Sequence, residues 1–164
     1  MLAKEKNYKQ ANKRGITMEY LSKILYEAKE ELEATFDYDT TLDIKEQGFT
    51  FEELDKTYKL FFIHKGNKTI LSIEQDAQEL YNKEFNTDET MANVFEALEH
   101  DIVVYIAVEE ISKGWNSQMT INGAIFDFMD YTTYVDEIKE LTRSKGINAD
   151  IKVDKWGLAW EYLR

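Results

Sequence analysis

The sequence of 164 residues contains no cysteine, no proline and only seven glycines. The absence of cysteine excludes disulfide bonds, thiolate metal sites, iron–sulfur clusters and a cysteine nucleophile. The scarcity of proline and glycine argues against linkers, collagen-like tracts and low-complexity disorder. A chain of this length forms about one domain and buries roughly two thirds of its unfolded surface, so a core can form without covalent staples.

Long apolar runs are missing as well. The longest uncharged one, Ile102–Val108, is far shorter than the ~18–20 residues that span a bilayer. No basic start followed by an apolar segment indicates a signal peptide. We therefore expect a cytoplasmic protein without membrane attachment. The abundance of lysine, glutamate, asparagine, isoleucine and tyrosine favours a bacterial or phage coding sequence.

The common catalytic motifs are absent too. The sequence has no GxSxG, no GxxxxGK[ST] and no GxGxxG, which argues against nucleophile-elbow hydrolases, P-loop NTPases and Rossmann enzymes. The two histidines, His64 and His100, are 36 positions apart and neither lies in an HExxH motif. We interpret His100 as a surface residue at a helix–strand junction. The expectation is a protein with no catalytic residue, no cofactor and no metal ligand.

Acidic patterns that occur in metal enzymes are present but not specific. The segments 43–45 and 150–152 each place an aspartate two residues before a lysine, as some nucleases do, yet about four such triplets arise by chance at this composition. A nuclease also needs a basic surface for its substrate. Asp37 and Asp39 fit the exposed side of a half-buried strand. A metal- or acid-pair-dependent hydrolase stays open as a third hypothesis.

The charge is unevenly distributed. The net charge is −12, from 32 acidic and 20 basic residues. Residues 1–14 hold five basic residues and one acidic residue, whereas residues 74–137 hold 15 acidic residues and two lysines. We therefore divide the chain into a basic polar arm over residues 1–15 and one acidic domain over residues 16–164. Such an asymmetry bears on partners and solubility rather than on fold.

The hydrophobic spacing predicts helices and strands along the whole chain. Apolar residues at helical spacing predict helices, and alternating or β-branched runs predict strands. The expected helices are 17–34, a helix opened by Ser72 and Gln75 as a capping box, a helix from Asn86 or Thr87 through Leu98, and 131–145. The expected strands are 36–44, 58–63, 69–73, the buried run 102–108, the pair flanking Asn122-Gly123, and the last residues from 156 on. Residues 47–56 fit either a strand or a short helix.

Hairpins outnumber strand–helix–strand crossovers in this pattern. The sequence thus predicts an α+β fold: a single compact domain with a largely antiparallel sheet and about four helices. Trp115 follows Gly114 in a predicted loop, where an exposed indole ringed by acidic residues can anchor an interface.

The acidic segment over residues 74–137 is the feature with the clearest functional interpretation. Carboxylates displayed from rigid elements imitate the phosphates of a nucleic acid and can occupy a basic groove on another protein. We expect the partner-binding residues to be Glu89, Glu96, Glu99, Asp101, Glu109, Glu110, Trp115, Asp127, Asp130, Asp136 and Glu137.

The leading hypothesis is therefore a non-enzymatic, phage- or mobile-element-encoded inhibitor of a nucleic-acid-handling protein, of the anti-CRISPR or anti-restriction kind. The expected partner is a basic protein, and the acidic face is not expected to bind nucleic acid directly. The alternative is an immunity- or antitoxin-type protein that neutralises a basic toxin. A purely solubilising acidic face is the plain interpretation.

Overall fold

The computed structural model describes residues 21–44, 48–113, 117–119, 131–154 and 157–163. It has an α+β fold in which all strand pairings among these residues are antiparallel, as the hydrophobic pattern predicts. The described residues form three helices and seven strands, in two sheets. No described helix is long and apolar enough to cross a membrane. Trp115 and the expected hairpin at Asn122-Gly123 lie outside the described residues.

The larger sheet has four strands in sequence order: β1 (Gly48–Glu53), β2 (Lys56–Lys65), β3 (Lys68–Gln75) and β4 (Gln78–Asn86). The predicted hairpin over 58–73 is confirmed as β2 and β3, which are joined by Gly66 and Asn67. Gly66 has a φ of 64°, a left-handed conformation that glycine adopts without strain. The undecided segment 47–56 contains β1 and the turn that leads into β2.

The helix expected after Ser72 is wrong. Ser72 and Gln75 belong to β3, the turn consists of Asp76 and Ala77 with positive φ, and β4 follows. The register shifts next to Ile73, so that Leu80 and Tyr81 are consecutive and both buried. A bulge of this kind interrupts the period of two on which strand prediction depends. Leu80 and Tyr81, together with Ala77, therefore have the i, i+3, i+4 spacing that is typical of a helix.

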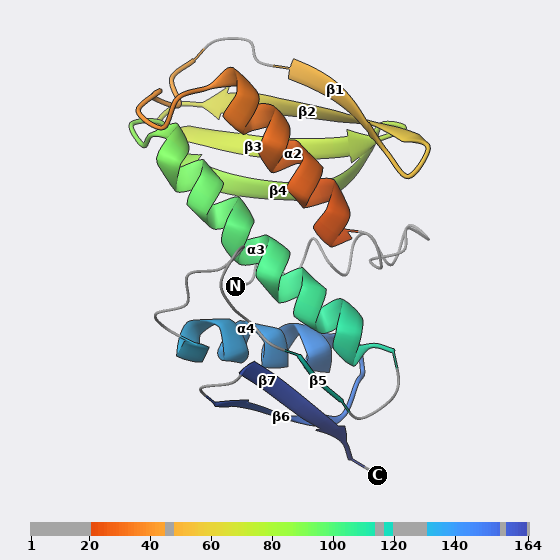
Figure 1. The fold of residues 1–164 in the computed structure, drawn as a ribbon. Coiled ribbons are helices and arrows are strands. Elements are labelled where there is room, and N and C mark those ends of the chain that lie inside the picture. Colours follow the sequence, from red (N-terminus) through yellow and green to blue (C-terminus); the bar gives the residue numbers. More distant parts are fainter. Residues whose placement is uncertain (1–20, 45–47, 114–116, 120–130, 155–156, 164) are drawn as a thin grey trace.

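Two helices cover one face of this sheet (Figure 1): α2 (Leu21–Thr35) and the first part of α3 (Met91–Ile111). The predicted helix over 17–34 is confirmed for the described residues, and Leu25, Ala28 and Leu32 of α2 are fully buried. These side chains meet Phe51, Leu60 and Leu71 of the sheet in one core.

The strand expected over residues 36–44 is also wrong. The segment instead forms turns that lie beside the start of α3. There, Met91 N–H donates to Thr40 O and Ala92 N–H donates to Tyr38 O. The first backbone N–H groups of a helix have no partner within the helix. The loop supplies those acceptors, and this need outweighs the rough alternation of Phe36 and Tyr38.

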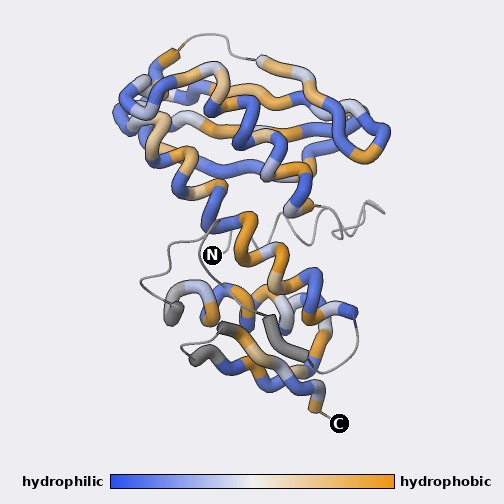
Figure 2. The backbone as a smooth tube through the Cα atoms, viewed as in Figure 1, coloured by the Kyte–Doolittle hydropathy of each residue, from blue (hydrophilic) through white to orange (hydrophobic). Residues whose placement is uncertain are grey.

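The run 102–108 is helical and continues α3, so the buried strand expected there is wrong as well. Every residue from Ile102 to Val108 except Ile106 is buried. Figure 2 shows this part of α3 as mainly hydrophobic, in contrast to the alternating colours of its first turns. A helix that is covered on all sides loses its amphipathic period. Its sequence then resembles that of a buried strand.

The smaller sheet lies beyond the first one along α3 (Figure 1). It has the order β5-β7-β6, formed by β5 (Ser117–Met119), β7 (Gly157–Tyr162) and β6 (Ala149–Asp154), and α4 (Tyr131–Ser144) packs with it. The helix over 131–145 and the final strand are confirmed. Gly146 follows α4 with a φ of 86°, as a C-terminal glycine does. Thus α3 is the element that both sheets share.

Candidate functional site

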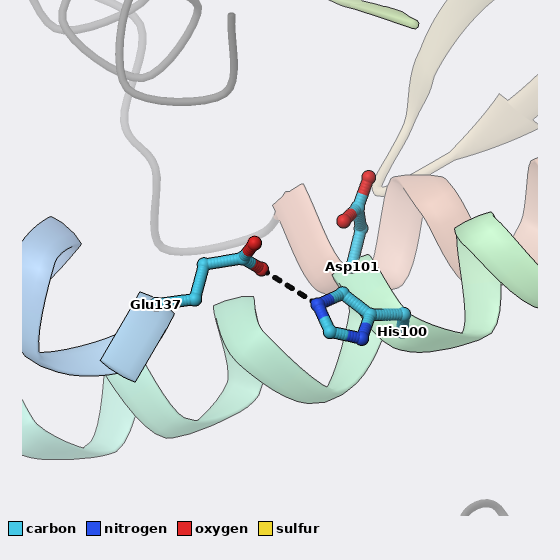
Figure 3. A group of neighbouring side chains, drawn as sticks. All are labelled: His100, Asp101 and Glu137. Carbon is cyan, nitrogen blue, oxygen red and sulfur yellow. Dashed lines mark hydrogen bonds and ion pairs between the residues drawn. The ribbon is translucent and has the colours of Figure 1, made fainter. Parts of the chain in front are cut away.

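A cluster of five polar side chains lies where β4 and α4 meet α3. Tyr81 and Lys83 come from β4, His100 and Asp101 from the middle of α3, and Glu137 from α4. Figure 3 shows the Glu137 carboxylate pointing toward the His100 ring, with Asp101 beside it on the same helix. Three separate elements therefore bring ionisable groups into one region with little solvent access.

Asp101 is fully buried, although it is charged at neutral pH in water. The Tyr81 hydroxyl donates a hydrogen bond of 2.5 Å to Asp101 Oδ2, and Lys83 Nζ lies 3.6 Å from the same oxygen. Burial, followed by the charge of Asp101, raises the pKa of Tyr81 well above its ordinary value. Tyr81 is thus held as a neutral donor, and a buried carboxylate with such donors is far less costly than an isolated one.

His100 and Glu137 form the second half of the cluster. His100 Nε2 lies 2.8 Å from Glu137 Oε2, and the imidazole stacks on Tyr134 with ring centroids 4.4 Å apart. Glu137 is only 7% exposed. These contacts connect α3 to α4 and fix the orientation of the imidazole ring.

The cluster places ligand types for a metal ion close together. One ligand atom each from His100, Asp101 and Glu137 lies within 4.8 Å of the other two. An imidazole nitrogen with two carboxylate oxygens is a donor set that divalent transition metals accept. His100 and Glu137 are also a base and an acid at hydrogen-bond distance. The arrangement is therefore compatible with a metal site, a proton-exchange site or a polar joint between α3 and α4.

A half-buried carboxylate outside the cluster, that of Glu109 on α3, lies at the start of α2. Ser22 donates twice to it, from the backbone N–H at 3.2 Å and from the hydroxyl at 2.8 Å. Burial raises the pKa of Glu109 to about 7, although the Ser22 hydrogen bonds and Lys145 oppose the shift. Glu109 therefore positions α2 against α3 and titrates near neutral pH.

The positions expected to bind a partner separate into four groups. Exposed are Glu96 and Asp136. Half-buried are Glu89, Glu99, Glu109 and Glu110. Buried are Asp101 and Glu137, in the cluster described above. Outside the described residues lie Trp115, Asp127 and Asp130. Three of the half-buried residues have partners: Glu109 accepts from Ser22, Glu89 accepts from Asn86 N–H, and Glu110 pairs with Lys113 at 2.9 Å.

The structure adds an acidic surface that the sequence analysis missed. Glu27 on α2 interacts with Glu30 and Glu31 of the same helix and with Glu53 on β1. Burial, followed by these neighbouring charges, raises the pKa of Glu27. The signal was available, because the segment 27–33 has four glutamates and one lysine. It was missed because residues 74–137 carry the largest share of the net negative charge, and the prediction was confined to them.

The remaining acid–lysine and histidine patterns have local roles. Asp150 pairs with Lys152 on β6 at 3.4 Å. His64 hydrogen-bonds Thr69 through Nδ1 at 2.9 Å and the Ile44 carbonyl through Nε2, so it fastens the loop before β1 to the β2–β3 hairpin. Asp37 and Asp39 lie exposed in the turns that follow α2.

Comparison of the chain with protein-family models, with curated proteins and with solved structures found no match.

Proposed function

We propose that this chain is a non-enzymatic binding protein that inhibits a nucleic-acid-handling protein by occupying its basic cleft. The observation that carries the proposal is the crowding of surface carboxylates on α2, where burial and then the charges of Glu30, Glu53 and Glu31 raise the pKa of Glu27. Repulsion of this kind opposes folding, and it is relieved when a basic surface binds. An inhibitor of the anti-CRISPR or anti-restriction kind uses that relief.

The partner-facing carboxylates we propose are those with solvent access. On α3 they are Glu96, which is exposed, and Glu99, which is half-buried. On α2 they are Glu30, which is exposed, and Glu27 and Glu31, which are half-buried. Residues three and four apart on a helix lie on one face, about 5–6 Å between Cβ atoms. Such a row offers regularly spaced negative charges to lysines and arginines that otherwise contact phosphates.

The experiment is a pull-down from a bacterial lysate with the immobilised protein, washed at low salt and then at about 0.5 M salt, which screens charges beyond a few ångströms. We expect a nucleic-acid-binding protein to elute between the two washes. The double variant Glu30→Lys/Glu96→Lys should lose it.

The matched control is Glu52→Lys/Glu84→Lys, which makes the same charge change on the sheet. Glu52 and Glu84 are exposed, and they neighbour Phe51 and Lys83, whose side chains face the helices. The control should retain the partner. If both double variants lose it equally, net charge alone explains the binding and the proposal fails. Recovery of a small basic toxin instead would favour an immunity-type protein.

A further inference from the structure

We propose that His100, Asp101 and Glu137 bind one divalent transition-metal cation of the Zn²⁺ class, which joins α3 to α4. The inference is independent of the proposed function. It begins from placement: the three side chains come from two helices, and one ligand atom from each lies within 4.8 Å of the other two.

The distances suit a small cation. Zn²⁺ binds histidine nitrogen at 2.0–2.1 Å and carboxylate oxygen at 2.0–2.2 Å, so tetrahedral ligand atoms lie about 3.3 Å apart. His100 Nε2 and Glu137 Oε2 are 2.8 Å apart, slightly closer than this, and the most distant pair in the cluster is within 4.8 Å. Small side-chain rotations that move the ligand atoms by up to about one ångström bring all three to bonding distance of one ion.

The burial of the cluster also favours a cation. Asp101 is fully buried and Glu137 is 7% exposed, so two carboxylates are desolvated next to one another. Each carboxylate destabilises the charge of the other in such a setting. A divalent ion between them turns that repulsion into attraction. The imidazole favours a transition metal over Mg²⁺ or Ca²⁺, which prefer oxygen ligands.

Neighbouring side chains already orient two of the ligands. The Tyr81 hydroxyl holds Asp101 through Oδ2, and Tyr134 stacks on the His100 ring. Metal sites use outer groups of this kind to fix ligand geometry, and their loss typically weakens binding 10- to 100-fold.

Lys83 gives the proposal a distinctive consequence. Its ammonium lies 3.6 Å from Asp101 Oδ2, and its side chain is 25% exposed on the edge strand β4. A bound cation and this ammonium repel one another, so Lys83 competes with the metal for Asp101. Replacement of Lys83 by glutamine should therefore strengthen metal binding, whereas a merely structural cluster would show no metal response to the change.

The test is titration of the tag-free, chelator-treated protein with Zn²⁺ by calorimetry and with Co²⁺ by visible absorption. We expect one ion per chain. His100→Gln and Glu137→Gln should each weaken binding at least about tenfold, and Lys83→Gln should tighten it. The matched controls His64→Gln and Glu99→Gln remove the same groups outside the cluster and should bind like the wild type.

Circular dichroism of each metal-free variant checks that it is folded. Glu137→Asp, which keeps a carboxylate, should recover part of the affinity if Glu137→Gln proves unstable. Absence of saturable one-to-one binding in the wild type would overturn the proposal. Equal affinity in the cluster variants and the controls would overturn it as well.

Discussion

The two halves of α3 face different surroundings. In the first half, Met91, Val94, Phe95 and Leu98 are buried, while Asn93 and Glu96 face solvent. In the second half, from Asp101 on, nearly every side chain is covered. The first half packs with α2 against one side of the large sheet, whereas the second half also meets α4. One helix thus has an outer surface at one end and almost none at the other.

The difference determines what a charged residue does. Glu96 in the first half is exposed, and its charge is available to a partner. Asp101 and Glu109 in the second half accept hydrogen bonds from Tyr81 and Ser22, respectively. A carboxylate at the covered end therefore acts through specific donors, and its removal or titration affects stability. At the open end the same group acts through the field that it adds to the surface.

The largest expected effect is that of Val104→Pro, which breaks the covered half of α3. Proline removes one backbone hydrogen bond and clashes with the preceding turn, which costs about 3 kcal/mol or more. Val104→Ala keeps the helix and loses only two buried carbon atoms, about 1–2 kcal/mol. Urea denaturation measures both. A loss for the proline variant no larger than that for alanine would contradict a continuous helix.

Next in size is Tyr81→Phe, which removes the hydroxyl donor to Asp101. A hydrogen bond to a charged group contributes about 1.5–3 kcal/mol, and the carboxylate stays buried without it. Tyr58→Phe is the control, since Tyr58 is also buried in the sheet and its hydroxyl makes no hydrogen bond to the described residues. The free energy of unfolding near pH 7 should fall for Tyr81→Phe and stay within about 0.5 kcal/mol for Tyr58→Phe. Equal losses would show that Asp101 does not depend on this donor.

The third prediction concerns pH. The pKa of Glu109 is raised from 4.5 to about 7, so its contribution to stability is full below about pH 4.5 and is lost as the pH rises through 7. At 1.36 kcal/mol per pKa unit, a rise from 4.5 to about 7 corresponds to about 3.4 kcal/mol. Partial solvent exposure of Glu109 reduces this contribution to about 1–2 kcal/mol. Glu109→Gln should therefore gain stability relative to the wild type between pH 5 and pH 8.

The control for this experiment is Glu110→Gln, one position further along the same helix and paired with Lys113 near the surface. Its stability difference from the wild type should not change over the same pH range by more than a few tenths of a kcal/mol. A flat difference for Glu109→Gln would mean that Glu109 is ionised throughout this range.

The smallest expected effect on stability is that of Glu96→Lys at the open end. Surface substitutions away from special features usually change the free energy of unfolding by less than about 0.5 kcal/mol. Thermal denaturation of Glu96→Lys should match that of the wild type. A large loss would show that the first half of α3 is also covered, and would remove the contrast between the two halves.

The sequence predicted elements correctly where one side of an element faces solvent. The helix around Leu25 and Ala28, the hairpin at Gly66 and the helix that ends before Gly146 all have such a side, so their apolar residues recur with the right period. The run from Ile102 to Val108 has no exposed side, so it has no period to detect. The turns over 36–44 owe their shape to backbone hydrogen bonds with Met91 and Ala92, which no local pattern encodes.

The candidate site could be predicted only in part. The acidic character of the surface follows from composition, but burial decides which carboxylates reach it, and burial depends on the tertiary fold. His100 and Asp101 directly precede the apolar run, which was a signal that they lie near the core. Glu137 and Tyr81 joined them from 37 and 20 positions away, and sequence spacing carries no information about such pairs.

The most direct test of the central claim, that the acidic surface stands in for nucleic acid, is competition. Proteins of a bacterial lysate are bound to DNA-cellulose at about 50 mM salt, where electrostatic contacts are strong, and are then eluted with the purified protein. We predict that the wild type and Glu52→Lys/Glu84→Lys release a discrete DNA-binding protein, and that Glu30→Lys/Glu96→Lys does not. If the wild type releases nothing, or if all three proteins release the same set, the claim is contradicted.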